Sequence, residues 1–200
     1  MKLFFDLETT GLPQQIAFDN WYPPEEINKY SCSRIIEIGI ILVDKNEKIK
    51  KTYNVLIKPD DFTSLKPIVA EITGITDSEI INNGKNLKDI IEEIKPLFKK
   101  CSVINSYNLN FDLNILLSEL YRLHDKEFIN KIKSKKHECS LQLATKYFKM
   151  DRYPKLEKVY KILFKTDPNQ DHRAFGDAIL CKEVYYKIKD NCSNKNKTNS

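Results

Sequence analysis

The feature that most constrains the fold is a run of apolar, largely β-branched residues from Arg34 to Val43, Arg-Ile-Ile-Glu-Ile-Gly-Ile-Ile-Leu-Val. Because β-branched side chains favour extended backbone, this run predicts a β-strand. A shorter apolar run at 2–7 predicts a buried strand before it, and 53–57 predicts a third strand after it. The turn sequence Asp44-Lys45-Asn46-Glu47 predicts that the second and third strands form a hairpin.

The remainder of the chain alternates between helical and strand patterns. Apolar residues recur at helical spacing in four segments, 87–98, 112–123, 156–164 and 174–188, and residues 102–105 read as a fourth strand. Strands that come first and are followed by alternating helices and strands indicate an α/β fold with a mixed sheet.

The chain has 200 residues, 41% of them hydrophobic, which is enough for one domain with a substantial core and too little for two. We expect the folded domain to cover residues 1–189. The polar Asn-, Lys- and Ser-rich run 190–200 has no apolar period, and we expect it to be a disordered tail. The segment from Pro13 to Ser33 reads as a long loop.

Charge and cysteine content say little about function but more about compartment. The formal net charge of +5 is only a weak pointer to a polyanionic partner. Five scattered cysteines without a CxxC pair argue against a disulfide framework and a structural zinc site. No signal peptide or membrane-spanning stretch is apparent, so we expect a reducing intracellular compartment, cytoplasm or nucleus.

Two carboxylates at the end of the first strand are the most informative chemical feature. Asp6 and Glu8 alternate with Phe5 and Leu7, so both acids point to the same face. Neighbouring carboxylates repel unless a cation lies between them, and oxygen ligands favour a hard ion such as Mg²⁺ or Mn²⁺. For an isolated Asp-x-Glu, a strand that ends in solvated acids is the competing interpretation.

Further candidates follow later in the chain. Asp112 lies at the start of a predicted helix, where the helix N-terminus alone would also explain a carboxylate. His172 and Asp177 are five residues apart, so they converge only if His172 precedes the last helix and Asp177 lies in its first turn. That arrangement would place a mobile base beside a fixed metal ligand. A loop histidine that caps the helix is the competing interpretation.

Taken together, these motifs resemble the DEDDh branch of the DnaQ-like 3′–5′ exonucleases, over residues 1 to about 187. Three family motifs are matched in order, by Asp6-x-Glu8-Thr9-Thr10-Gly11, by Asn108, Phe111 and Asp112, and by His172, Ala174 and Asp177. Weaker matches are Arg34 to Gly39, Ile57 to Pro59 and Ile72 to Thr76. The resemblance implies a ribonuclease H-like fold, in which helices flank a central mixed five-stranded sheet whose second strand is antiparallel.

The resemblance also implies a mechanism. Asp6, Glu8 and Asp177 would hold one Mg²⁺ or Mn²⁺ ion, and Asp6 and Asp112 would reach a second. His172 would take the proton from the attacking water, and a nucleoside 5′-monophosphate would leave. Thr9, Thr10, Gly11 and Leu12 would line the pocket for the 3′-terminal nucleotide, Leu12 as an apolar wedge, with Asn108 and Phe111 also binding substrate. The implied partner is a nucleic acid with a free 3′ end, together with a possible polymerase or other protein.

The sequence differs from the family pattern at two places, and several residues have two possible interpretations. Tyr107 stands where many relatives carry histidine, and Cys139-Ser140-Leu141 stands where they often have Asp-Thr-Leu or Cys-Thr-Leu. Trp21 and Tyr22 either pin the long loop or stack on a base, and Arg152 and Lys155 either contact phosphate or belong to a solvated face. An RNA-specific exoribonuclease or oligoribonuclease and an inactive nucleic-acid-binding module are the alternative functions. DNA or RNA preference, pathway and oligomeric state lie beyond the sequence.

Overall fold

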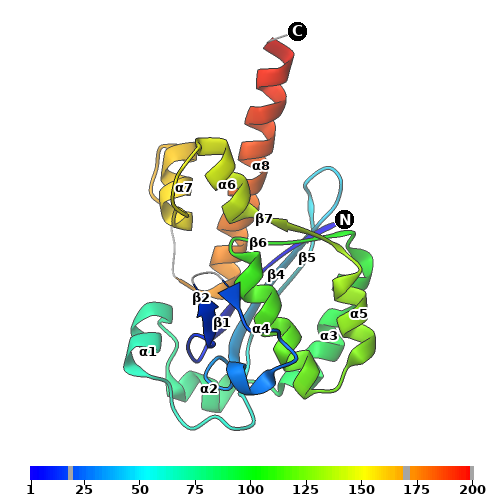
Figure 1. The fold of residues 1–200 in the computed structure, drawn as a ribbon, viewed down its shortest axis with the longest axis vertical. Helices are drawn as coiled ribbons and strands as arrows, with labels where there is room; N and C mark the ends of the chain where they lie inside the picture. The colour runs from blue at the N-terminus through cyan, green and yellow to red at the C-terminus, as the bar shows by residue number, and fades with distance from the viewer. Residues whose placement is uncertain (18–19, 169–171, 199–200) are drawn as a thin grey trace.

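A mixed sheet of five strands organises the structure, which is a computed structural model describing residues 1–17, 20–168 and 172–198, with side chains as far as Asn194 (Figure 1). The strand order is β5-β4-β1-β6-β7. The strands are β1 (Lys2–Thr9), β4 (Ile35–Val43), β5 (Ile49–Leu56), β6 (Val103–Ser106) and β7 (Lys136–Cys139). The predicted mixed five-stranded sheet is confirmed.

Strand direction also agrees with the prediction. β4 is antiparallel to both β1 and β5, whereas β1, β6 and β7 pair in parallel. The hairpin between β4 and β5 is closed by the Asp44 carboxylate, which accepts hydrogen bonds from the backbone N–H groups of Asn46 and Lys48 at 2.8 and 3.1 Å. β4 corresponds to the second predicted strand, so the expectation that this strand is antiparallel is confirmed.

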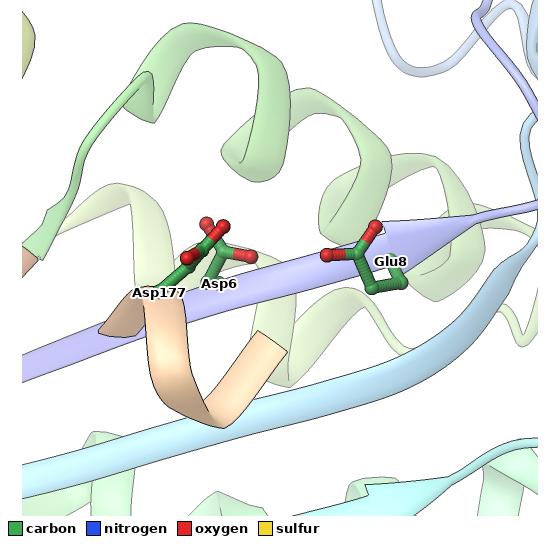
Figure 2. Close-up of side chains that lie close together, drawn as sticks. All are labelled: Asp6, Glu8 and Asp177. Carbon is green, nitrogen blue, oxygen red and sulfur yellow. The ribbon is translucent and has the colours of Figure 1, made fainter. Parts of the chain in front are cut away.

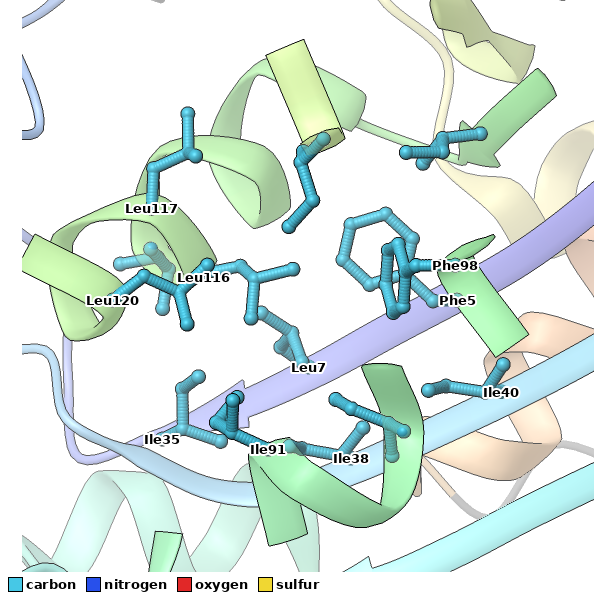
Figure 3. Packing of buried hydrophobic residues seen from close by; sticks show 14 of the residues in the cluster. Phe5, Leu7, Ile35, Ile38, Ile40, Ile91, Phe98, Leu116, Leu117 and Leu120 are labelled. Atoms are coloured by element: carbon cyan, nitrogen blue, oxygen red, sulfur yellow. The ribbon is translucent and has the colours of Figure 1, made fainter. Parts of the chain in front are cut away.

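One face of the sheet is covered by α3 (Leu87–Lys100), α4 (Leu109–Arg122) and α5 (Lys126–Lys133). Alternate residues of β1, among them Phe5 and Leu7, point into this layer and pack against Phe98 and Leu116 (Figure 3). Every second side chain of β1 is thereby committed to the core, which leaves Asp6 and Glu8 on the opposite face.

The opposite face is covered by α8 (Ala174–Thr198), which packs against Phe4, Ile41 and Val43 through Ala178 and Cys181. α6 (Ser140–Phe148) and α7 (Leu156–Phe164) pack against the outer side of α8. Because α8 is covered on both sides, its first turn is held firmly against the sheet.

The end of α8 differs from the prediction. The helix continues to Thr198, so residues 190–198 are helical where we expected a disordered tail, and 199–200 lie outside the described residues (Figure 1). The predicted helix ended at Ile188 because the apolar period ends there, but residues 189–198 contain neither glycine nor proline to stop a helix.

The segment between β5 and α3 was left without predicted elements and contains two short helices. α1 (Pro67–Thr73) and α2 (Asp77–Asn83) share a small apolar cluster with Ile36. α2 begins with a capping box, in which the Thr76 hydroxyl accepts from the Glu79 N–H and the Glu79 carboxylate accepts from the Thr76 N–H.

The predicted long loop 13–33 contains β2 (Gln15–Ala17), β3 (Asn20–Trp21) and a 3₁₀ helix, η1 (Ile27–Tyr30). Its attachment to the domain is specific, since Arg122 donates a 2.6 Å hydrogen bond to the carbonyl of Ile27 and the buried Tyr30 donates to the carbonyl of Tyr22. The rings of Trp21 and Phe111 meet edge to face at 5.6 Å. These contacts favour the pinning role of Trp21 over stacking on a base.

All five cysteines lie within the described residues and are free thiols. Among the described helices, none combines the length and the apolar character that a membrane crossing requires.

Candidate active site

The register of β1 against β4 places the two acids of β1 opposite two unusual residues of β4. Asp6 pairs with Gly39 and Glu8 pairs with Glu37. All four lie on the face that α8 covers. Gly39 and Glu37, the two residues that interrupt the apolar sequence of β4, therefore both face α8.

Gly39 allows α8 to approach the sheet closely. A Cβ at this position would lie 2.4 Å from the carbonyl carbon of Ala174 and 2.4 Å from the backbone nitrogen of Phe175, distances that no side chain can occupy. The first turn of α8 therefore rests directly on the β4 backbone. This contact brings Asp177, on that first turn, beside Asp6 (Figure 2).

Glu37 fixes the same helix end. Its side chain is 1% exposed and accepts hydrogen bonds from Arg173 Nε at 3.0 Å, from Arg173 Nη2 at 2.5 Å and from the backbone N–H of Ala174 at 2.9 Å. A buried carboxylate is tolerated when it is paired in this way, and it also suits the positive end of a helix. Glu37 and Gly39 were not predicted to have a role at the site, although a charged residue inside an apolar strand was the available signal.

Three of the predicted ligands converge. Asp6, Glu8 and Asp177 each offer a carboxylate oxygen, and these oxygens lie within 4.8 Å of one another. Figure 2 shows Asp177 beside Asp6, with Glu8 further along the strand. His172 precedes α8 and Asp177 lies in its first turn, which is the arrangement that convergence of the two residues would require, but His172 is not part of this group of ligands.

Asp112, the fourth acid, lies next to this group on α4. It is 3% exposed, and the Ser106 hydroxyl donates to it at 2.6 Å. Its charge is the largest electrostatic contribution, after burial itself, that raises the pKa of Asp6. We call these four residues the acid cluster.

Burial and mutual repulsion raise the pKa values of the acid cluster. Burial is the first cause for Asp6, whose pKa lies well above its usual range, and the charges of Asp112, Glu8 and Asp177 add to it. Burial, followed by the charges of Asp177 and Glu37, raises the pKa of Glu8 to about 8. Burial raises the pKa of Asp112 to about 7, against the lowering effect of the Ser106 hydrogen bond.

The donor set of the acid cluster fits a hard divalent cation. All its ligand atoms are carboxylate oxygens, which Mg²⁺ and Mn²⁺ prefer and which zinc or copper sites supplement with nitrogen or sulfur. A cation would also relieve the repulsion that raises these pKa values. The predicted Mg²⁺ or Mn²⁺ site is compatible with this geometry.

The raised pKa values predict how stability depends on pH in the absence of divalent cations. Unfolded Asp and Glu titrate near pH 4, whereas Glu8 and Asp112 in the fold titrate near 8 and 7. Between about pH 4 and about pH 8 the folded state binds more protons than the unfolded state, so stability falls as pH rises. We expect the Tm measured in EDTA to fall from pH 5 to pH 8, and excess Mg²⁺ to reduce this fall. An EDTA-treated protein whose Tm rises over this range would contradict the assignment.

A cavity of about 540 Å³ opens beside the acid cluster. Glu8 belongs to both, and the cavity is also lined by four of the residues predicted to bind substrate: Thr9, Gly11, Leu12 and Phe111. The contribution of α1 and of the residue before it was not predicted, although Ile72 to Thr76 is one of the weaker family matches in the sequence. That side of the cavity consists of Lys66, Ile68, Val69, Ile72 and Thr73.

A sequence model of the RNase_T family, described as exonuclease, matches residues 3–185. The chain belongs to this exonuclease family. The predicted family is thereby confirmed.

Individual relatives agree with the family. The chain is 26% identical, over 193 residues, to the PolC-type DNA polymerase III of Ureaplasma parvum serovar 3, covering 96% of this chain and 12% of that polymerase. It therefore spans about one eighth of the length of this relative.

Solved structures show the same fold. Escherichia coli exonuclease I in complex with a dA16 oligonucleotide has 20% identity and a TM-score of 0.68, covering 94% of this chain and 40% of that one. The nuclease domain of 3′hExo, a DEDDh family member bound to rAMP, has 16% identity and a TM-score of 0.64, covering 95% and 92%. The ribonuclease H-like fold is confirmed.

Three of the predicted site residues, Thr10, Asn108 and His172, are not among the residues that line the 540 Å³ cavity. Thr10 turns away from the cavity, since its hydroxyl donates to the carbonyl of Cys32 at 3.1 Å and accepts from the N–H of Arg34 at 3.0 Å. Asn108 precedes α4, where its carbonyl accepts from the N–H of Phe111 at 2.9 Å. His172 is exposed and lines a separate hollow of about 440 Å³ beside α7, with Lys158 and Lys161.

Proposed function

We infer that this protein is a metal-dependent 3′–5′ exonuclease that hydrolyses phosphodiester bonds at nucleic-acid 3′ ends and releases nucleoside 5′-monophosphates. The observation that carries the inference is the shared position of Glu8, which belongs to the acid cluster and also lines the 540 Å³ cavity. A terminal nucleoside held in that cavity has its phosphodiester at the carboxylates.

Each residue of the site has a role in this proposal. Asp6, Glu8 and Asp177 would hold one divalent cation, and Asp6 and Asp112 would reach a second. Bound cations supply Lewis-acid activation of water and neutralise charge on the phosphate. Ile68, Ile72 and Phe111 form an apolar surface for the base, and the volume suits a single small ligand. A pocket for one terminal nucleoside favours cleavage from an end.

His172 is the proposed general base, and its position must change before it acts. It lies outside the acid cluster and has a left-handed backbone, with φ of 51°. A non-glycine residue in this conformation stores about 1 kcal/mol or more of strain. Catalytic groups in ligand-free structures are often displaced and align when substrate binds. The next residue, Arg173, is anchored to Glu37 and limits how far His172 can move.

A pH profile tests this role. Because a general base makes the rate depend on pH, we expect His172→Ala to lower kcat by about 10²–10⁴-fold and to give a flatter pH profile of kcat than the native protein. The exposed His124→Ala variant, by comparison, should keep the native profile. A His172→Ala enzyme with an unchanged rate and profile would exclude His172 as the base.

Leu12 provides a test of the nucleotide cavity. Its side chain is 71% exposed, so Leu12→Ala should change the free energy of unfolding by no more than about 0.5 kcal/mol. Loss of its apolar contact with the terminal base should lower kcat/KM about tenfold. Ile16→Ala, at a side chain 56% exposed on β2 and outside the cavity lining, is the matched control. Equal kcat/KM values for the two variants would argue against the cavity as the nucleotide site.

Both DNA and RNA are candidate substrates. The exonuclease I structure contains a DNA oligonucleotide, whereas the 3′hExo domain is bound to rAMP. Similarity to part of a PolC-type polymerase supports a polymerase partner. Mass spectrometry of the products from matched DNA and RNA oligonucleotides tests the proposal, which predicts mononucleotides that carry a 5′-phosphate. Nucleoside 3′-monophosphates would contradict it.

A further inference from the structure

A second concave surface lies between α6 and α7 and is positively charged. This groove, of about 580 Å³, is lined by Lys149, Arg152, Lys155 and Lys158, with Asp151 as its acidic residue. Tyr153 also lines it and is 44% exposed. We call this surface the α6–α7 groove. It combines several cations with an exposed aromatic ring, the two components of a site for a single nucleic-acid strand.

The cations of the groove are available to an external anion. Lys155 has a side chain that is 84% exposed, and its contact with Glu157 is a loose 3.7 Å. Within the described part of the chain, no carboxylate lies within salt-bridge distance of Lys149, Arg152 or Lys158. Exposed, weakly paired cations of this kind gain from contact with phosphates, because counterions are released.

The groove is connected to the proposed base. Lys158 lines both the α6–α7 groove and the 440 Å³ hollow, which also contains His172, Lys161 and the acids Glu157 and Asp167. A nucleic-acid strand bound in the groove could therefore continue past Lys158 to His172, which precedes α8. The path runs along α7 and ends beside the acid cluster's own helix.

The groove is also fixed to the catalytic sheet. The Tyr107 hydroxyl, directly after β6, donates a 2.7 Å hydrogen bond to the carbonyl of Pro154 in the groove. The preceding residue, Ser106, holds Asp112 of the acid cluster. Tyr107 thus gives the α6–α7 loop a defined position relative to the acid cluster.

We propose that the α6–α7 groove binds the sugar–phosphate backbone of the substrate strand upstream of the terminal nucleotide, with Tyr153 stacking on a base. This rests on the proposed exonuclease function and extends it to the part of the substrate outside the catalytic cavity. The groove contributes affinity for long strands, whereas a substrate of one nucleotide does not reach it.

The test uses the triple variant Lys149→Gln, Arg152→Gln, Lys155→Gln. The control is Lys99→Gln, Lys100→Gln, Lys131→Gln, which removes the same charge from exposed lysines of α3 and α5 on the opposite layer. Binding of a 5′-fluorescein-labelled dT20 oligonucleotide is followed by fluorescence anisotropy at increasing KCl concentrations. Cleavage of dT20 and of the p-nitrophenyl ester of thymidine 5′-monophosphate is measured in parallel.

We expect the groove variant to bind dT20 about tenfold more weakly, with a salt slope reduced by about 2, since each single-strand phosphate contact contributes about 0.7. The ratio of kcat/KM for dT20 to that for the ester should also fall about tenfold, and the control should match the native protein. Groove and control variants with equal affinity and salt slope would overturn the proposal. If the native protein cleaves neither substrate, the proposed function fails, and the binding measurement still decides the groove.

Discussion

Replacement of Asp6 by asparagine should abolish nuclease activity while leaving the protein folded. Asp6 is the carboxylate that faces all the other members of the acid cluster, and asparagine keeps its size but loses the charge that binds a cation. Loss of metal-assisted charge stabilisation, worth several kcal/mol, corresponds to a decrease in kcat of roughly 10³-fold or more. Steady-state cleavage of a labelled oligonucleotide with Mg²⁺ measures it.

A Tm measurement distinguishes loss of the catalytic carboxylate in Asp6→Asn from unfolding of the variant. Because the Asp6 carboxylate is repelled by its neighbours, the neutral amide should raise the Tm of the metal-free protein near pH 8. Asp190→Asn changes the same residue type at an exposed position of α8 and should alter neither activity nor Tm. An Asp6→Asn protein that keeps native activity would refute the assigned role of the acid cluster.

Gly39→Ala should damage the active site from a position that touches no substrate. The added Cβ would lie 2.4 Å from backbone atoms of Ala174 and Phe175, so the first turn of α8 must move away from β4. Overpacking of this kind costs about 1–3 kcal/mol of stability. Because Asp177 moves with the helix, we expect Mn²⁺ affinity, measured by calorimetry, to weaken and kcat to fall about 10²-fold.

Gly84→Ala is the matched control for this prediction. Its Cβ would lie 2.4 Å from the carbonyl oxygen of Ile80, an equally close contact at the end of α2. It should lower the Tm to a similar degree and leave the Mn²⁺ affinity of the folded protein unchanged. If both variants lose Mn²⁺ affinity equally, the effect comes from general destabilisation and Gly39 has no specific positioning role.

The strands that could be predicted are those in which burial selects the side chains. β1 and β4 are covered on both sides, so their apolar runs are clear in the sequence. β7, with the sequence Lys-His-Glu-Cys, is an edge strand whose first two side chains are exposed. It is defined by parallel backbone pairing with β6, which leaves no apolar pattern and therefore escaped prediction.

The acid cluster, too, was predictable from the sequence only in part. The alternation of β1 and the placement of Asp177 in a first turn follow from local periodicity, so their shared face was predictable. The closeness of α8 to the sheet depends on Gly39 and Glu37 of another strand, a long-range contact that local patterns do not report. For the same reason the share of the cavity that α1 provides and the position of His172 beside α7 appear only in the structure.

The most direct test of the central claim is a degradation ladder with matched oligonucleotides carrying a label at the 5′ or the 3′ end. With Mg²⁺, the 5′-labelled strand should shorten one nucleotide at a time, whereas the 3′-labelled strand should release labelled mononucleotide at once. EDTA should stop both, because the acid cluster then lacks its cation. Internal fragments, shortening from the 5′ end or activity that persists in EDTA would contradict a metal-dependent 3′–5′ exonuclease.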